Sequence, residues 1–235
     1  MTMCSKTTTL LSLFRLSQIS DSAFPVGSFS FSMGLEAAVA EGIVRDSEGL
    51  EEYTRGALYA AAEGDGIAML EAFRAASAGE LSRLPEIDQR VYAMKPTEEG
   101  RKMSVRMGGR LAGLIHSIAP SSLTATLGEW IHEGHIVGTY PTAQAVAGVE
   151  LSTGEEALFA AHLYGVASMI LSAALRLMRL SHFESQRILY HLGPLCQGLY
   201  ERYRHLTIDD MCSFSPTVEL CCSLHERGKE RLFMN

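Results

Sequence analysis

Basic residues are scarce in this 235-residue sequence. It contains 20 Lys and Arg against 27 Asp and Glu, which gives a formal net charge of -7. Nucleic-acid binding depends on clustered Lys and Arg that neutralise phosphates, so this balance argues against general nucleic-acid binding. We therefore expect no nucleic-acid partner.

Cysteine is also sparse and irregularly placed. The five cysteines form an odd set with no C-x-x-C pair. A chain of this length does not depend on disulfides, so the simplest interpretation is reduced thiols in a cytosolic protein. The start of the chain lacks a good signal-peptide core or cleavage site, which agrees with a cytoplasmic location.

Sequence motifs of several common enzyme and membrane classes are missing. There is no GxxxxGK[ST] phosphate loop and no GxSxG nucleophile motif. One apolar run, Ala157 to Leu175, is nearly long enough to span a bilayer. It consists mostly of small residues and contains His162, so we interpret it as the buried central helix of a bundle and expect no membrane partner.

Helical periodicity recurs throughout the chain, whereas strand alternation is hard to find. Apolar residues make up 47% of the sequence, enough to bury a core, and no repeat or linker divides it. We predict an all-α fold, a single-domain bundle of about nine or ten helices over residues 1–235. The chain ends, 1–9 and 228–235, are expected to be flexible, with a partly ordered C-terminal tail.

Capping residues and helix breakers predict where these helices begin and end. Breaks are expected at Gly64 to Gly66 and between Gly79 and Pro85. A last helix after Ser215 and Pro216 would carry Leu220, Leu224 and His225 on its inner face. The expected capping residues are Asp46 or Ser47, Thr97, Ser121 or Ser122, Thr153 with Glu156, and Ser181 with Glu184.

Two rows of residues on the helix that follows Thr97 have different expected roles. Gly108, Gly109, Ala112 and Gly113 form a strip with almost no side chain, which permits close approach of another helix. Lys102, Arg106 and Arg110 recur at i, i+4, so they share another face. The simpler interpretation of this basic row is a solvated face, and the alternative is a docking stripe for an acidic partner.

The least ordinary stretch is DSAFPVGSFSFSMGLE, residues 21–36. Pro25 lacks a backbone N–H and Gly27 tolerates positive φ, so a helix cannot run smoothly through both. Three phenylalanines lie among its serines, which is unusual for a solvated linker. We expect a packed loop, either a tight connection between helices or a recognition loop.

Two groups of residues could be considered for metal binding. His132 and His135 are spaced i, i+3, but HExxH spacing is absent, and the simpler interpretation is surface or packing histidines. Cys221, Cys222 and His225 could bring thiolate and imidazole together on a helix, a pair that suits Ni²⁺, copper or Zn²⁺. Two ligands do not make a site, so buried apolar cysteines are the preferred interpretation.

Four segments resemble, in order along the chain, motifs of the urease accessory protein UreF family. They are DSAFPVGSFSFSMGLEAA, EEGRKMSVRMGGRL, AALRLMRLSHFESQRIL and the closing HERGKERLFMN. The sequence departs from the family at Phe31, where His is frequent, and at residues 179–182, where Arg-Leu-Ser-His replaces Pro-Leu-Gly-Gln. Any metal or contact role at those positions is therefore not carried over.

The resemblance implies an all-α, non-catalytic protein that acts with UreD (also called UreH) and the GTPase UreG to deliver nickel to apo-urease. It implies a homodimer that bridges UreD and UreG, with no tightly bound cofactor, nickel in transit, and a proposed effect on the GTPase. The motifs also match at Leu35 and Leu177. The resemblance assigns partner contacts to Asp21, Ser22, Pro25, Gly27, Ser30, Gly34, Glu36, Glu99, Arg101, Ser104, Arg176, Gln186, His225, Glu226, Arg231, Leu232 and Phe233.

Two other functions remain open at this point. A helical adaptor unrelated to metal would differ only in its partners. A metal-dependent hydrolase would need at least three converging ligands and an open position, and the sequence offers no such set.

Overall fold

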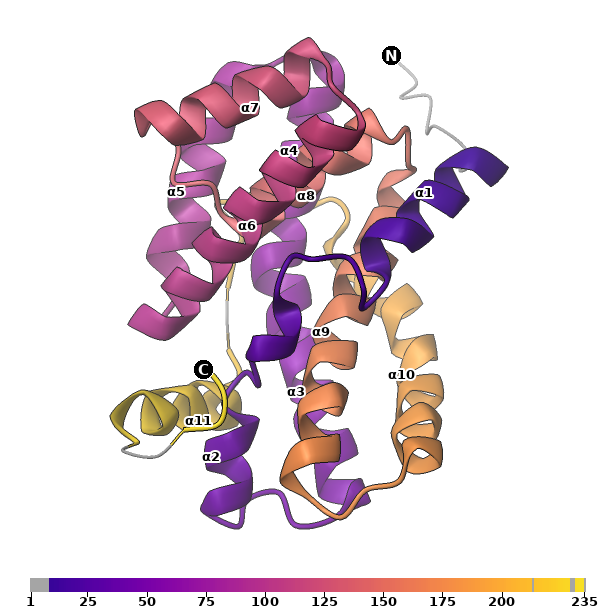
Figure 1. Ribbon diagram of the computed structural model, residues 1–235, viewed down its shortest axis with the longest axis vertical. Helices are drawn as coiled ribbons and strands as arrows, with labels where there is room; N and C mark the ends of the chain where they lie inside the picture. The colour runs from indigo at the N-terminus through magenta and orange to yellow at the C-terminus, as the bar shows by residue number, and fades with distance from the viewer. Residues whose placement is uncertain (1–8, 213, 229–230, 235) are drawn as a thin grey trace.

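The computed structural model describes residues 9–212, 214–228 and 231–234, and within these ranges it is all α-helical, as predicted (Figure 1). The expected flexible end at 1–9 falls almost entirely outside the described residues, as do Lys229, Glu230 and Asn235 of the tail. The α-helices are α1 Leu10–Ser20, α2 Leu35–Ala40, α3 Ser47–Ala61, α4 Ile67–Ala78, α5 Leu84–Met94, α6 Glu98–Ile118, α7 Ser122–Glu133, α8 Tyr140–Glu150, α9 Glu155–Leu177, α10 His182–Tyr203 and α11 Pro216–Arg227.

Most of the predicted helix starts are confirmed. The side chains of Asp46, Thr97 and Ser121 accept hydrogen bonds from the first-turn amides of α3, α6 and α7. Ser181 and Glu184 form a reciprocal capping box at α10, so the departure from the family pattern at 179–182 produces a cap. Side-chain capping is a local interaction, which is why short sequence patterns predict it.

The capping box predicted at Thr153 and Glu156 is wrong. The N-cap of α9 is Gly154, and no side chain caps it. Thr153 is fully buried, and its hydroxyl donates to the Gly148 carbonyl at the end of α8. The tight turn between α8 and α9 therefore uses this hydroxyl to satisfy a C-terminal carbonyl.

The interruption predicted at Gly64 to Gly66 is confirmed, and α4 begins directly after it at Ile67. Residues Ala62–Gly66 form a π-helical segment that joins α3 to α4. A Cβ at Gly66 would lie 2.7 Å from the Phe159 ring, so this glycine allows α9 to approach closely. Glu63 in the segment accepts from the Tyr203 hydroxyl at 3.0 Å and from the Phe214 amide at 3.0 Å, so the segment also anchors distant parts of the chain.

Helix α5 was not predicted, because Pro85 was interpreted as part of a break. In the structure Pro85 occupies the first turn of α5, where its missing N–H costs nothing. Buried Asp88 on this helix accepts from the amides of Val137, Gly138 and Thr139 at 2.7–2.9 Å. Helix α5 thus holds the connection that leads into α8.

The glycine strip of α6 is confirmed at one position and wrong at two. A Cβ at Gly108 would lie 2.6 Å from the Thr139 carbonyl carbon and nearer still to the Gly138 carbonyl oxygen. Gly109 and Gly113 have no such neighbour within 4 Å. Close approach of α6 to the start of α8 therefore depends on Gly108, with buried Ala112 on the same side.

Helix α9 crosses the middle of the molecule between α3 and α10 (Figure 1). It is long and apolar enough by composition to cross a membrane, but 56% of its most apolar 18-residue stretch is buried inside the molecule. Its contacts with α1, α2, α3 and α10 match the predicted central core helix. Helix α8, which is almost wholly buried, fills the corresponding position between α4 and α6.

Candidate functional site

Three segments that lie far apart in the sequence meet at His225. Glu36 is in the first turn of α2, Glu99 is in the first turn of α6, and His225 is in the last turn of α11. The ring Nε2 lies 3.0 Å from Glu36 Oε2 and Nδ1 lies 2.9 Å from Glu99 Oε2. The imidazole therefore bridges carboxylates from two other helices, and each of its ring nitrogens has a partner.

The end of the chain is bound to the same two carboxylates. The Leu232 amide donates to Glu36 Oε1 at 2.7 Å and the Phe233 amide donates to Glu36 Oε2 at 3.1 Å. The Arg231 guanidinium forms an ion pair with Glu99. Residues 231–233 are therefore held against α2 and α6 through backbone and side chain together.

Phe233 anchors the tail in the apolar core. It is only 4% exposed, and the Arg176 guanidinium from α9 lies 4.1 Å from its ring centroid. Arg176 also donates to the Phe29 carbonyl at 2.7 Å, and the Met234 amide donates to the Ser30 carbonyl at 2.8 Å. The loop before α2 and the tail are thus fixed to each other. We call Glu36, Glu99, Arg176, His225, Arg231 and Phe233 the tail cluster.

Glu226 adds a second contact between α11 and α6. Its carboxylate accepts from the amides of Glu98 and Glu99 at 3.0 and 3.3 Å. These amides belong to the first turn of α6, whose N–H groups have no partner within the helix and attract negative charge. Glu226 therefore fixes the end of α11 against the start of α6.

The pKa of Glu36 is lowered by this environment. Burial raises it, but hydrogen bonds from the Leu232 amide, the His225 ring and the Phe233 amide have the larger combined effect. The net pKa lies below the ordinary value of 4.5, so Glu36 is ionised at neutral pH. The ionised carboxylate accepts from the two tail amides and contacts the His225 ring.

The remaining candidates of the first motif shape the loop. Asp21 accepts from the Ala23 amide at 2.7 Å, and Gly27 and Gly34 have positive φ of 86° and 76°. A Cβ at Gly34 would lie 2.6 Å from the Cys222 backbone nitrogen, so Gly34 allows α2 to meet α11. Ser22 and Pro25 are exposed. The packed loop predicted from the phenylalanines is seen at Phe31, which is buried, while Phe29 is 66% exposed.

The candidates of the second and third motifs do not all join the tail cluster. Arg101 donates to the Lys95 carbonyl at 2.6 Å, and the Ser104 hydroxyl accepts from the Tyr140 amide at 3.1 Å. Both contacts stay within the helical core around α6. Gln186 lies on the exposed surface of α10.

The geometry does not favour a metal site at Cys221, Cys222 and His225. Carboxylates occupy both ring nitrogens of His225. Burial raises the pKa of the Cys222 thiol to about 12 and also raises that of Cys221, which disfavours the thiolates that bind metals. His132 and His135 are exposed, and the described residues contain no group of three or more His, Cys, Asp or Glu that could hold a metal ion.

The inner face of α11 differs from the prediction at one residue. Leu220 is 55% exposed, whereas Val218, Cys221 and His225 are buried. The helix presents His225 to α2 and α6, and this rotation places Leu220 on the outer side. The i, i+4 spacing alone favoured Leu220 and Leu224 over Val218 and Cys221.

A separate cavity of about 200 Å³ lies between the first loop and helices α6, α8 and α9. It is lined by the buried ring of His162, whose Nδ1 lies 2.8 Å from Gln144 Oε1. The Nε2 atom of His162 has no hydrogen-bond partner among the described residues. Burial lowers the pKa of His162 to about 4, so the ring is neutral. No residue of the tail cluster lines this cavity.

Comparison with known proteins agrees with the motif resemblance. The family model UreF matches residues 44–193, which is more than half of the chain. The chain belongs to the UreF family. Urease accessory protein UreF 2 of Brucella suis is 43% identical over 223 residues, covering 95% of this chain and 92% of that protein. Urease accessory protein UreF of Yersinia enterocolitica is 38% identical over 223 residues, covering 95% and 98%.

The UreF family match and the tail cluster cover different parts of the chain. Residues 44–193 include Glu99 and Arg176 but not Glu36, His225, Arg231 or Phe233. The structure connects the matched region to the tail through Glu99 and Arg176, and Arg176 also binds the loop before α2. No sequence signal indicated that Glu36 would accept the amides of Leu232 and Phe233, because backbone amides carry no side-chain pattern.

Proposed function

We propose that this UreF-family chain is a non-catalytic scaffold of urease maturation, which holds UreD and UreG together while nickel is inserted into apo-urease. The observation that carries the proposal is the convergence of segments from all four family motifs around the docked tail. Charged side chains that could have formed a reaction centre are instead paired with one another. This arrangement supports a role in positioning protein surfaces.

The docked tail presents an apolar surface to solvent. Leu232 is 63% exposed and Met234 is 48% exposed, and exposed Phe29 belongs to the loop that the tail contacts. Apolar and arginine side chains of this kind contribute strongly to protein interfaces. We assign partner contact to this surface, with the tail cluster fixing its orientation.

The other parts of the proposal follow the family. The nucleotide belongs to UreG, which agrees with the absence of a phosphate-loop motif from this sequence. The chain works in the cytoplasm as a homodimer, influences the GTPase through contact, and holds no tightly bound cofactor. Nickel is cargo that passes through the assembly.

Deletion of residues 228–235 tests the role of the tail. The helices retain most of their core when Phe233 is lost, so we expect a folded helical protein by circular dichroism. Urease activation, measured as nickel-dependent urease activity in a reconstituted mixture, is expected to be lost. Full activation by the truncated chain would contradict the proposed role of the tail.

A matched pair of substitutions separates exposed contacts from tail docking. Leu232→Asp changes an exposed tail residue while Phe233 stays buried. It is expected to weaken partner binding and urease activation. Leu220→Asp changes a similarly exposed leucine on α11 and is expected to leave both near the wild-type level. Equal effects of the two substitutions would argue against specific contact at Leu232.

A further inference from the structure

A groove of about 740 Å³ lies between α6 and the docked tail. One wall is formed by Met103 and Val105 of α6, and the other by Phe233 and Met234 of the tail. Phe31, the residue that departs from the family pattern, lines it as well. The groove therefore has an apolar interior and is completed only when the tail is docked.

The rim of this groove is positively charged. Arg101, Lys102, Arg106 and Arg231 line it, together with one carboxylate, that of Glu99. Glu99 is already bound to His225 and Arg231. The groove is thus a local basic region on a chain whose formal net charge is -7.

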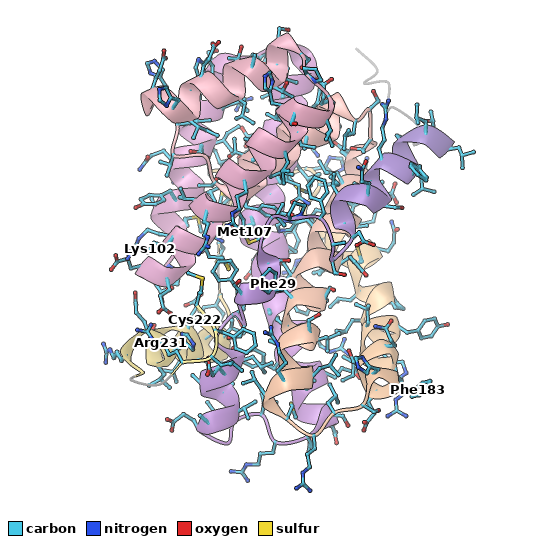
Figure 2. The ribbon with its side chains drawn as sticks, in the orientation of Figure 1. Phe29, Lys102, Met107, Phe183, Cys222 and Arg231 are labelled. Atoms are coloured by element: carbon cyan, nitrogen blue, oxygen red, sulfur yellow. The ribbon has the colours of Figure 1, made fainter. Side chains whose placement is uncertain are left out.

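Two of these cations are available to a partner. Lys102 pairs with Glu98 across one helical turn, but the two side chains are 73% and 63% exposed, so the pair is worth little in water. Arg106 contacts the Met234 sulfur at 3.0 Å, and no carboxylate among the described residues lies within ion-pair distance of it. Figure 2 shows Lys102 on the same side of the molecule as Arg231.

We propose that this groove binds an acidic segment of a partner protein, with partner carboxylates pairing Lys102 and Arg106 and an apolar partner side chain entering between α6 and the tail. The occupant follows from charge complementarity, because a basic rim attracts acidic chains and repels basic ones. The inference rests on the proposed function and adds the chemistry of the partner surface. It also gives the basic row of α6 the docking role that sequence spacing left open.

The test is charge reversal on the groove rim. The Lys102→Glu/Arg106→Glu variant should bind one of the purified proteins UreD and UreG about tenfold or more weakly than wild type in low salt. Raising the ionic strength should weaken wild-type binding and have much less effect on the variant, because salt screens exposed charge pairs. Affinities are measured by isothermal titration calorimetry with the full-length chain.

The matched control is Arg179→Glu/Arg187→Glu, which makes the same charge change at two exposed arginines that do not line the groove. Its affinities should stay within about twofold of wild type. Equal affinity and equal salt dependence for wild type and the Lys102/Arg106 variant would overturn the groove assignment. Failure of the wild-type chain to bind either protein would instead overturn the proposed function.

Discussion

His225 illustrates how one residue can connect three segments. Its side chain is 2% exposed and contacts two carboxylates, those of Glu36 and Glu99. In the His225→Leu variant Glu36 and Glu99 lose their contacts with the imidazole and keep only those with the tail, so we expect the free energy of unfolding to fall by about 3 kcal/mol. Urea denaturation followed by circular dichroism measures this loss.

His191→Leu is the matched control for His225. His191 contacts Glu51 at 3.3 Å but is 51% exposed, so its replacement should cost less than about 0.5 kcal/mol. Similar losses for both variants would mean that burial between two carboxylates gives His225 no special importance.

Glu36 makes tail docking sensitive to acid. Folding lowers the pKa of Glu36 below its ordinary value of 4.5. Its contribution to the free energy of unfolding is therefore complete above about pH 4.5, and it is lost as the pH falls through the pKa of the folded state. Hydrogen exchange of the Leu232 and Phe233 amides should therefore show weaker protection below about pH 4.5, and Glu36→Gln should lack most of this dependence. Identical pH profiles for the two proteins would contradict the assignment.

At the residue scale, the sequence predicted which residues belong to the site better than it predicted the contacts between them. Family motifs selected Glu36, His225 and Phe233, but not the bonds between them. The Glu36–Phe233 contact joins residues 197 positions apart, and its donor is a backbone amide. Such a contact depends on how α2, α6 and α11 pack, which local patterns do not encode.

At the scale of elements, adjacent glycines of α6 have opposite expected effects. Gly108→Ala places a methyl group against the Gly138–Thr139 backbone, so we expect a loss of about 3 kcal/mol in unfolding free energy. Gly109→Ala meets nothing within 4 Å and should stabilise the helix by about 0.5–1 kcal/mol. Urea titration of both variants checks the pair, and equal effects would show that α6 does not depend on close approach at Gly108.

Helix starts were predictable where a side chain caps its own helix, as at Thr97 and Ser181. Prediction failed where tertiary contacts decide the local structure. At Gly64 to Gly66 the sequence predicted the interruption but not its π-helical form, in which Gly66 makes room for Phe159. At Thr153 the hydroxyl donates to the Gly148 carbonyl of the preceding helix. The capping-box pattern of Thr153 and Glu156 therefore does not cap α9.

At the scale of the whole molecule, composition and periodicity were sufficient to predict an all-α single domain. The arrangement in Figure 1, where the tail returns to the loop before α2, was not predictable because each contact involves distant segments. This arrangement connects the tail to α6 and α9, and the loop before α2 to α9. It gives the proposed scaffold a fixed surface.

The most direct test of the scaffold account is whether this chain joins two partners that do not otherwise remain together. Purified UreD, UreG and the full-length chain are mixed and separated by size-exclusion chromatography with light scattering. We predict one complex that contains all three proteins and is absent when this chain is omitted. Co-elution of UreD and UreG without this chain, or failure of the chain to join either protein, would contradict the account.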